Sequence, residues 1–463
     1  MHVLKYIGPF FRSNSLTKNN IANQLFHLSK ESVKDIVFNS KCGITIPFKE
    51  LKIKDIPVND INIFKSFSPL LCLYKKSNCN LYNLDKHLCW DESKAKMHIL
   101  ISSNSYMTLS LLELAEYFSK FKSTYPKKFY YRSLYCNTAK KQLDFYAANL
   151  RNVDGVFIDK KDISNDLSSE IKLEEKGKPF KFSDQALLMC AYYKFSTLSD
   201  EKYSIEYKNF SFDILKMFLQ FKDELYDLSA KELNKLVLAL NIFFDYSKDI
   251  KCYSLLIDLF EYLTENHVIE YSNNVTNACL TCLNSLILYK NSNLLKFKSQ
   301  ALNIYENLAN LYNPEYGMFI KETPKKDCSF YSTEIILYLV NSILANKLCE
   351  NKEMYISIVL DVFKHQILES GIIPSWPEVP PLDDPERYKN FSLKSEDLLE
   401  ENNFKMPTLA TPAASEIAPI FFKEITFNKK KRVFDSPKQS FYSDNNMFIF
   451  FILIHLFKGN FNC

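Results

Sequence analysis

Three carboxylate side chains belong to a repeated four-residue motif, here called the phrase, that stands at the start of three predicted helices. The phrase is an aromatic residue, a serine and two polar residues before an apolar run, at residues 182–185, 331–334 and 442–445. Asp184 and Asp444 come directly after the serine, and Glu334 lies one position later. The positive end of a helix dipole stabilises an ionised carboxylate in the first turn. The spacing therefore favours general bases or nucleophiles, although the same dipole favours Asp at helix starts that bind nothing.

A second repeated motif lies upstream of each phrase, so the repeating unit is a structured loop followed by a helix. The loops are residues 155–159, 317–321 and 432–435, and each places a Phe two positions after Gly155, Gly317 or Arg432. Ser103, Ser229 and Ser272 mark weaker helix starts of the same type, and Glu232 completes a capping box with Ser229. The six serines are predicted helix caps. Such self-similarity indicates a repeat architecture.

Helical periodicity fills the chain from residue 103 onward. Helices are predicted at residues 106–122, 133–150, 183–197, 208–226, 230–246, 251–265, 273–290, 295–312, 332–347, 352–369, 412–425 and 443–457. Those that follow the serine phrase are apolar nearly all round, and the others carry one apolar stripe, such as Leu256, Leu259, Phe260 and Leu263. A helix that is apolar on every side must be buried on every side. Alternating types therefore predict two concentric layers, an all-α fold of the (α/α)6 toroid class.

The N-terminal part of the sequence lacks the helical periodicity of the rest. Residues 1–100 are expected to be an irregular or partly β region with one helix at about 18–38, and residues 101–463 to be the toroid domain. Two arrangements of the ring stay open. Either the helix at 412–425 is additional and the helix at 18–38 closes the outer layer, or the helix at 412–425 is the sixth inner helix.

Composition excludes several functional classes. Seven glycines, widely spaced, rule out phosphate-binding and dinucleotide-binding glycine loops. A net charge of +4 gives no sign of a nucleic-acid partner, and the longest apolar run is too short to cross a membrane. Twelve unpatterned cysteines and the lack of a signal-peptide pattern predict reduced thiols in the cytoplasm. No cofactor or metal is expected, with Cys72, Cys79, His87 and Cys89 as a weak zinc alternative.

On its layers and helix starts, the stretch from residue 103 to 458 resembles the six-hairpin glycosidase-like superfamily. That resemblance implies a sugar site at the toroid mouth, where the inner helices begin. Hydrolysis there needs one protonated and one ionised carboxyl group, roughly 5 to 9.5 Å apart. The expected carboxylates are Asp159, Asp184, Glu334, Asp435 and Asp444, with Asp184 and Glu334 as the leading acid/base pair. The expected sugar-stacking rings are Phe182, Tyr331, Tyr442 and Trp376.

A proline-rich segment of the chain leaves a second function open. Residues 371–381 contain four prolines and Trp376, and acidic residues follow them within the long stretch 371–408. Such a strap is expected to be a lid that buries Trp376 near Tyr331 or Tyr442, a partner-binding segment, or a plain cover over helices. The sequence thus predicts a carbohydrate-active or carbohydrate-binding protein, with a non-catalytic interaction scaffold as the alternative. A terpenoid-type enzyme ranks last, because no Asp-rich metal motif is present.

Overall fold

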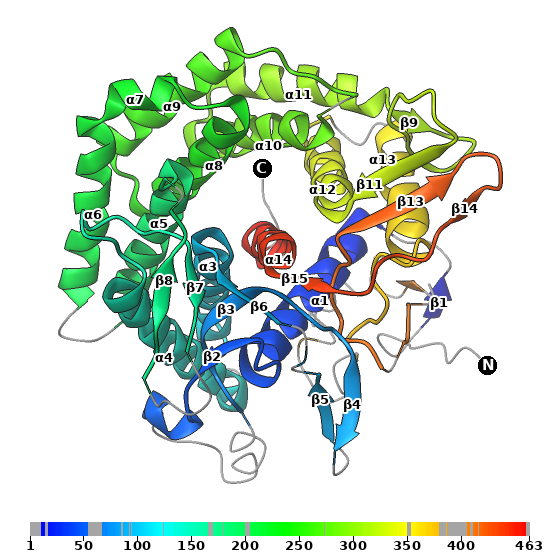
Figure 1. The fold of residues 1–463 in the computed structure, drawn as a ribbon. Coiled ribbons are helices and arrows are strands. Elements are labelled where there is room, and N and C mark those ends of the chain that lie inside the picture. Colours follow the sequence, from blue (N-terminus) through cyan, green and yellow to red (C-terminus); the bar gives the residue numbers. More distant parts are fainter. Residues whose placement is uncertain are drawn as a thin grey trace.

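Two concentric layers of α-helices form a closed ring in this computed structural model (Figure 1). The structure describes residues 11–13, 17–53, 67–84, 87–91, 93, 95–123, 125–164, 170–177, 179–199, 204–272, 274–349, 353–378, 386, 405–407, 411–414 and 416–459. The inner helices are α3 (Ile101–Ser119), α5 (Phe182–Leu198), α8 (Ala230–Ser247), α10 (Val275–Ser292), α12 (Ser332–Leu348) and α14 (Ser443–Phe457). The outer helices are α1 (Lys18–Asn39), α4 (Pro126–Asn149), α6 (Ser204–Gln220), α9 (Ile250–Asn266), α11 (Leu295–Ala309) and α13 (Glu353–Asp361).

The contacts between helices close both layers within the described residues. Each inner helix packs against the next in chain order, and α14 returns to pack against α3. Each inner helix is also covered by one outer helix, which for α14 is α1 and for α12 is α13. The six-hairpin (α/α)6 toroid expected from the sequence is therefore confirmed. The N-terminal helix closes the outer layer, so residues 18–39 supply a toroid helix although they lie before residue 101.

Burial follows the two helix types that the sequence distinguishes. Residues 334–346 of α12 are all buried, as a helix enclosed on every side requires. On α9 the buried side chains form one stripe that includes Leu256, Leu259, Phe260 and Leu263, and the opposite face meets solvent. The six serine-marked starts do belong to the six inner helices of the described chain. The apolar pattern alone thus sorts the helices into their layers.

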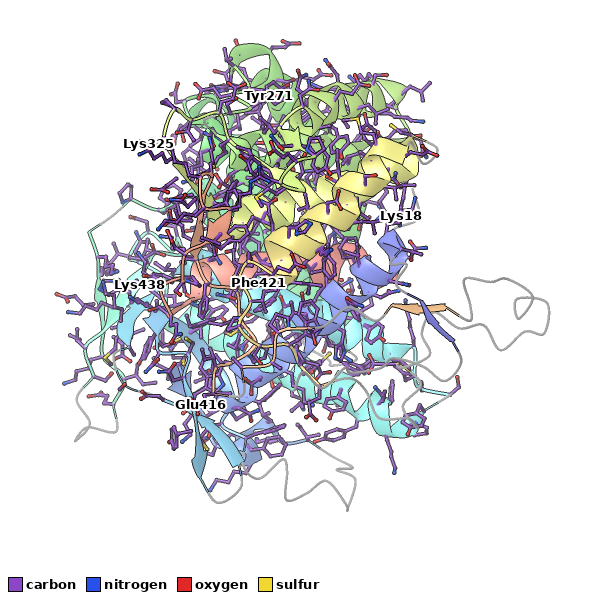
Figure 2. The ribbon with its side chains drawn as sticks, turned by 90° about the vertical axis from the view of Figure 1, so that its right-hand side faces the viewer. Lys18, Tyr271, Lys325, Glu416, Phe421 and Lys438 are labelled. Atoms are coloured by element: carbon purple, nitrogen blue, oxygen red, sulfur yellow. The ribbon has the colours of Figure 1, made fainter. Side chains whose placement is uncertain are left out.

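All inner helices begin at the same end of the ring, here called the mouth. This follows because inner and outer helices alternate along the chain and run antiparallel. Lys325 and Lys438, which lie shortly before α12 and α14, are on the mouth side in Figure 2, and Lys18 at the start of α1 is on the opposite side. The mouth side also holds the strands that lead into inner helices.

Short β-strands accompany the ring of helices. One sheet has the order β15 (Phe441–Tyr442), β3 (Leu70–Ser77), β6 (Lys96–Ile99), β7 (Lys160–Asp162) and β8 (Leu173–Glu175), and β2 (Gly43–Thr45) pairs with β3. A second has the order β11 (Asp327–Tyr331), β13 (Glu424–Asn428) and β14 (Val433–Phe434). The two-stranded pairs are β1 (Phe11–Ser13) with β12 (Lys405–Pro407), β4 (Leu81–Leu84) with β5 (His87–Trp90), and β9 (Tyr312–Asn313) with β10 (Met318–Phe319). Shorter helical pieces are η1 (Phe48–Leu51), α7 (Lys222–Tyr226) and the π-helical η3 (Val362–Leu368), which continues α13.

The helix predicted at residues 412–425 is wrong. The described part of this segment is extended and ends in β13. Pro419 lacks a backbone N–H and would break a helix at its centre. The backbone of Phe421 instead pairs with the Asn446 side chain, at 2.8 Å through its N–H and 2.9 Å through its carbonyl. The apolar residues of the segment are buried without helical order, which is why their pattern misled.

Candidate active site

Two carboxylates meet at the mouth around one lysine. Lys181, the residue before α5, places its ammonium nitrogen 3.3 Å from Asp184 Oδ2 and 3.8 Å from Asp159 Oδ2. Because both oxygens lie so close to one nitrogen, they are at most about 7 Å apart. The structure therefore brings together two of the expected site residues, which are twenty-five positions apart in the chain.

The loop that carries Asp159 is held in place by a side chain of α5. Gly155 turns the loop with φ of +81°, a conformation that favours glycine. The Phe157 N–H donates to Gln185 Oε1 at 3.0 Å, and Gln185 Nε2 donates to the Phe157 carbonyl at 2.8 Å. Asp159 Oδ1 then accepts from the Ile101 N–H at 2.9 Å, which caps α3. Helices α3 and α5 thus fix the position of this carboxylate.

A third carboxylate, Glu232 of α8, joins the group. Its Oε1 accepts from the Ser183 N–H at 3.0 Å and so caps the neighbouring helix α5. The sequence indicated Glu232 only as part of a capping box with Ser229. The Ser229 half is observed, since its hydroxyl accepts from the Glu232 N–H. Sequence reasoning missed Glu232 as a site residue because only the packing of α8 beside α5 brings it to Asp184.

The surroundings raise the pKa of Asp184 to about 6. Burial is the largest cause, because a buried carboxylate loses hydration, and the nearby charges of Asp159 and Glu232 add to it. The Lys181 ammonium opposes the rise without cancelling it. A carboxyl group with this pKa is partly protonated near neutral pH and can donate a proton, whereas the sequence favoured a base at this position. Asp159, Asp184 and Glu232 are called the carboxylate cluster below.

Glu334 occupies a separate part of the mouth. Helices α12 and α5 lie on opposite sides of the inner ring (Figure 1). The Glu334 Oε2 atom accepts from Lys321 Nζ at 2.9 Å and from the Tyr331 N–H at 2.9 Å, so it caps its own helix. The structure does not give Asp184 and Glu334 a common partner. The carboxylates whose charges act on Asp184 are Asp159 and Glu232, rather than Glu334.

The other expected acids are exposed. Asp444 accepts from the N–H of the next residue, Asn445, at 3.0 Å. Asp435 lies at the edge of a different cavity of about 560 Å³, which is also lined by Glu315, His365 and Arg432. A smaller cavity of about 180 Å³ lies between the starts of α8 and α10. Neither cavity is lined by a member of the carboxylate cluster.

The expected ring-stacking residues divide into two groups. Tyr331 is 41% exposed and Tyr442 is half-buried, so both present ring surface at the mouth. Phe182 is buried against Phe180 and Phe218, with ring centroids 5.0 and 6.1 Å away. The buried Phe182 side chain is therefore part of the core, and its assignment as a sugar platform is not supported by its packing.

The proline-rich strap does not place Trp376 over the mouth. Trp376 is buried and its ring meets Phe363 of η3 edge-on at 6.4 Å. Among the described ring contacts, Trp376 packs against Phe363 rather than against Tyr331 or Tyr442, which the lid alternative would place beside it. Further along, the buried Glu386 forms ion pairs with Lys30 of α1 and Lys128 of α4. The remainder of the strap, residues 379–385, 387–404 and 408, lies outside the described residues.

Most of the repeated serines are not helix caps. Helices α5, α12 and α14 begin without a serine cap, and α10 is capped by Asn274. The buried hydroxyls instead join neighbouring inner helices. Ser443 donates to Ser103 at 3.1 Å, and Asn445 Nδ2 donates to Ser332 Oγ at 2.7 Å. Small polar side chains recur because they let adjacent helix starts approach and hydrogen-bond.

The described residues contain neither a metal-binding group of side chains nor a membrane-spanning helix. No group of three or more His, Cys, Asp or Glu side chains there could hold a metal ion. Of the zinc alternative, Cys72 and Cys79 are fully buried, and His87 and Cys89 lie in the strand β5. Within the same residues, no helix is long and apolar enough to cross a bilayer.

No family model and no curated protein matches this chain. Solved structures with a similar overall course include cellobiose 2-epimerase from Bacillus thermoamylovorans B4167, 10% identical with a TM-score of 0.48 over 94% of this chain and 99% of that one. Another is the family 76 mannosidase Bt3792 from Bacteroides thetaiotaomicron, 10% identical with a TM-score of 0.46 over 95% and 98%. A third is an endoglucanase from the termite Nasutitermes takasagoensis, 11% identical with a TM-score of 0.45 over 96% and 99%. The assignment of the fold rests on the helix contacts of this chain itself.

Proposed function

We propose that this chain is a carbohydrate-active enzyme that cleaves a glycosidic bond at the toroid mouth. The observation that carries the proposal is the carboxylate cluster, in which Asp159 and Asp184 share Lys181 and the pKa of Asp184 is about 6. Glycosidic hydrolysis uses one carboxyl group that donates a proton and a second, ionised one within roughly 5 to 9.5 Å. The upper limit of about 7 Å between the two Asp oxygens is compatible with this range.

The roles follow from the environment of each group. Asp184 protonates the leaving oxygen, because its raised pKa leaves part of the population protonated near neutral pH. Asp159 acts as the ionised partner, since it accepts from the Ile101 N–H and faces Lys181, and both interactions stabilise negative charge. Glu232 and Glu334 are positioning residues that cap α5 and the start of α12.

Asparagine variants test this assignment. We expect Asp184→Asn and Asp159→Asn each to lower kcat at least about 100-fold on any oligosaccharide that the wild type turns over, since a positioned acid or base typically contributes that much. Asp444→Asn is the matched control, because Asp444 has the same place on α14 but is exposed. Circular dichroism checks that all three stay folded. Unchanged turnover in folded Asp184→Asn and Asp159→Asn contradicts the proposal.

A non-catalytic scaffold is the second candidate, and the burial of Asp184 favours it. Asp184 is only 4% exposed, and beneath it the Tyr106 ring packs against Phe448 and Phe451 at 5.4 Å each. A mouth filled by side chains suits a partner-binding surface rather than an enzyme. Failure of a broad panel of neutral and acidic oligosaccharides to bind the wild type, measured by calorimetry, decides in favour of the scaffold.

We infer a reducing compartment such as the cytoplasm. No disulfide joins any two of the eleven described cysteines, and most of them are buried. Cys279 and Cys282 are completely buried on α10, and burial raises the pKa of both thiols. Buried neutral thiols of this kind behave as small apolar side chains. The test is thiol labelling of protein that is taken from cells and then unfolded. We expect every cysteine to react as a free thiol.

A further inference from the structure

Three lysines and two tyrosines gather on the α12 and α14 side of the mouth. Lys423 lies 5.9 Å from the ring centroid of Tyr331 and 5.3 Å from that of Tyr442, so it stands between the two rings. Lys76 of β3 lies 4.9 Å from the Tyr442 ring, and the charge of Lys438 also acts on Tyr442. Tyr331, Tyr442, Lys76, Lys423 and Lys438 are called the lysine–tyrosine cluster.

Tertiary structure assembles this cluster from four separate segments. Tyr442 lies in β15, which pairs with β3 and so brings Tyr442 opposite Lys76. Tyr331 ends β11, which pairs with β13 and so comes beside Lys423, the residue before that strand. The two tyrosines directly precede the adjacent inner helices α12 and α14. Two inner helices therefore begin beside these lysines.

The positive charge of the cluster is not neutralised within the described residues. Lys76, Lys423 and Lys438 form no ion pair there, whereas Lys181 and Lys321 of the same mouth each hold a carboxylate. Three acids lie close in sequence, Glu424, Asp435 and Asp444; all are exposed, and within the described residues none forms an ion pair with these lysines. Three lysines without carboxylate partners at a mouth rich in carboxylates leave one side of it positive.

The positive charge of these lysines affects the pKa of Tyr442. Burial alone would raise the pKa of the Tyr442 phenol, yet its pKa is lowered. The hydrogen bond from Lys76 and the charges of Lys76, Lys438 and Lys423 outweigh the burial. A group that favours the negative form of a phenol also favours other anions at the same place.

We propose that the lysine–tyrosine cluster is a subsite for a negatively charged sugar unit, a uronate or a sulfate or phosphate ester. The tyrosine rings provide flat apolar surfaces for the sugar face, and the lysine ammonium groups pair with the anion. This inference rests on the proposed function, because it names the class of substrate for the same mouth. The carboxylate cluster lies at the starts of α3, α5 and α8, so the charged unit lies to one side of the bond that is cleaved.

Binding of small sugars to the full chain tests the subsite. Calorimetry with glucuronate, glucose 6-sulfate, glucose 6-phosphate and uncharged glucose compares carboxylate, sulfate and phosphate with no charge. We expect at least one acidic sugar to bind about 10-fold tighter than glucose at low salt, and the gap to close at high salt, where partly exposed charges are screened. Equal affinity of all four sugars at low salt overturns the inference.

Lysine variants locate the effect. Lys76→Gln combined with Lys423→Gln is expected to lower the affinity for the preferred acidic sugar about 10-fold or more and to leave glucose unchanged. Lys325→Gln is the matched control, because Lys325 is an exposed lysine on the mouth side but outside the cluster (Figure 2). Tyr442→Phe should retain sugar binding and Tyr442→Ala should lose it, since the ring supplies the contact. An acidic preference that survives the double variant overturns the inference.

The two proposals fail in distinguishable ways. If acidic sugars bind in a lysine-dependent way but Asp184→Asn changes no turnover, the catalytic proposal fails and the anionic subsite stands. If Asp184-dependent cleavage occurs on uncharged oligosaccharides and acidic ones are no better, the catalytic proposal stands and the subsite fails.

Discussion

At the scale of single residues, the burial of Asp184 makes its ionised form unfavourable for the stability of the fold. Its pKa is 3.8 in an ordinary setting and about 6 in the folded chain, so the folded state holds the proton more tightly than the unfolded state does. Stability gained from this proton is present at low pH and is lost as the pH rises through about 6. At neutral pH the ionised Asp184 therefore opposes folding. Groups retained at such a cost are common at active sites.

We expect Asp184→Asn to stabilise the protein at pH 7.5 by about 1–3 kcal/mol, because the amide removes the buried charge. The gain should shrink toward zero at pH 4.5, where wild-type Asp184 is mostly protonated when folded. Urea unfolding at the two pH values measures the difference. Asp444→Asn, at an exposed carboxylate, should show no such pH dependence. A stabilisation that is equal at both pH values contradicts the raised pKa.

At the scale of elements, a glutamine side chain holds each of two corresponding loops that precede inner helices. Gln185 holds Phe157 in the loop that carries Asp159. Gln366 of η3 holds Phe319 in the corresponding loop, with an N–H distance of 3.2 Å and a carbonyl distance of 3.4 Å. Both Phe side chains are buried, and Gly155 and Gly317 turn the two loops with positive φ. The repeated loop motif of the sequence thus corresponds to a repeated anchoring device.

We expect Gln185→Leu and Gln366→Leu each to lower the free energy of unfolding by about 2–4 kcal/mol, since each leaves a buried N–H and a buried carbonyl unpaired. Only Gln185→Leu should also lower turnover, because only that loop carries a member of the carboxylate cluster. Urea unfolding and kinetics on the same samples separate the two effects. Equal activity losses in both variants contradict a local role for the loop of Asp159.

At the scale of the whole molecule, a buried charge network ties the ring together at the end opposite the mouth. Glu113 of α3 is completely buried and accepts from His455 Nδ1 of α14 at 2.9 Å, from Tyr246 of α8 and from Lys458. Lys194 of α5 joins through Glu116 at 2.9 Å. Burial opposes the charge of Glu113, yet Lys458, His455 and Lys194 hold its pKa well below the usual range.

We expect Glu113→Gln to lower the free energy of unfolding by about 3–5 kcal/mol at pH 7, because it leaves buried positive charges without their partner. The lowered pKa of Glu113 stabilises the fold above pH about 4.5, and this contribution falls as the pH drops further. Thermal and urea unfolding measure the loss. Asp213→Asn is the control, since Asp213 pairs with Lys216 on the surface and should change stability by less than about 1 kcal/mol. A loss below that of the control contradicts the role of the network.

The sequence by itself determined the fold of this protein to a large extent. Helices that are apolar on every side must be enclosed, and helices with one stripe must cover them, so the period of the apolar residues decides the layer of each helix. The aromatic–serine phrase identified the inner helix starts, although the reason was not capping. The pattern misled at residues 412–425, where an apolar extended segment looks like a helix until Pro419 is given its weight.

Only the tertiary structure decided which carboxylates lie close together. Asp184 and Glu334 hold related positions in their helices, but α5 and α12 lie across the ring from each other (Figure 1). Asp159 reaches Asp184 through the loop anchored by Gln185, and Glu232 reaches it through the packing of α8 beside α5. Spacing along a chain predicts neighbours within one helix, because helical geometry is regular. Neighbours between helices depend on how the ring closes, which no local pattern records.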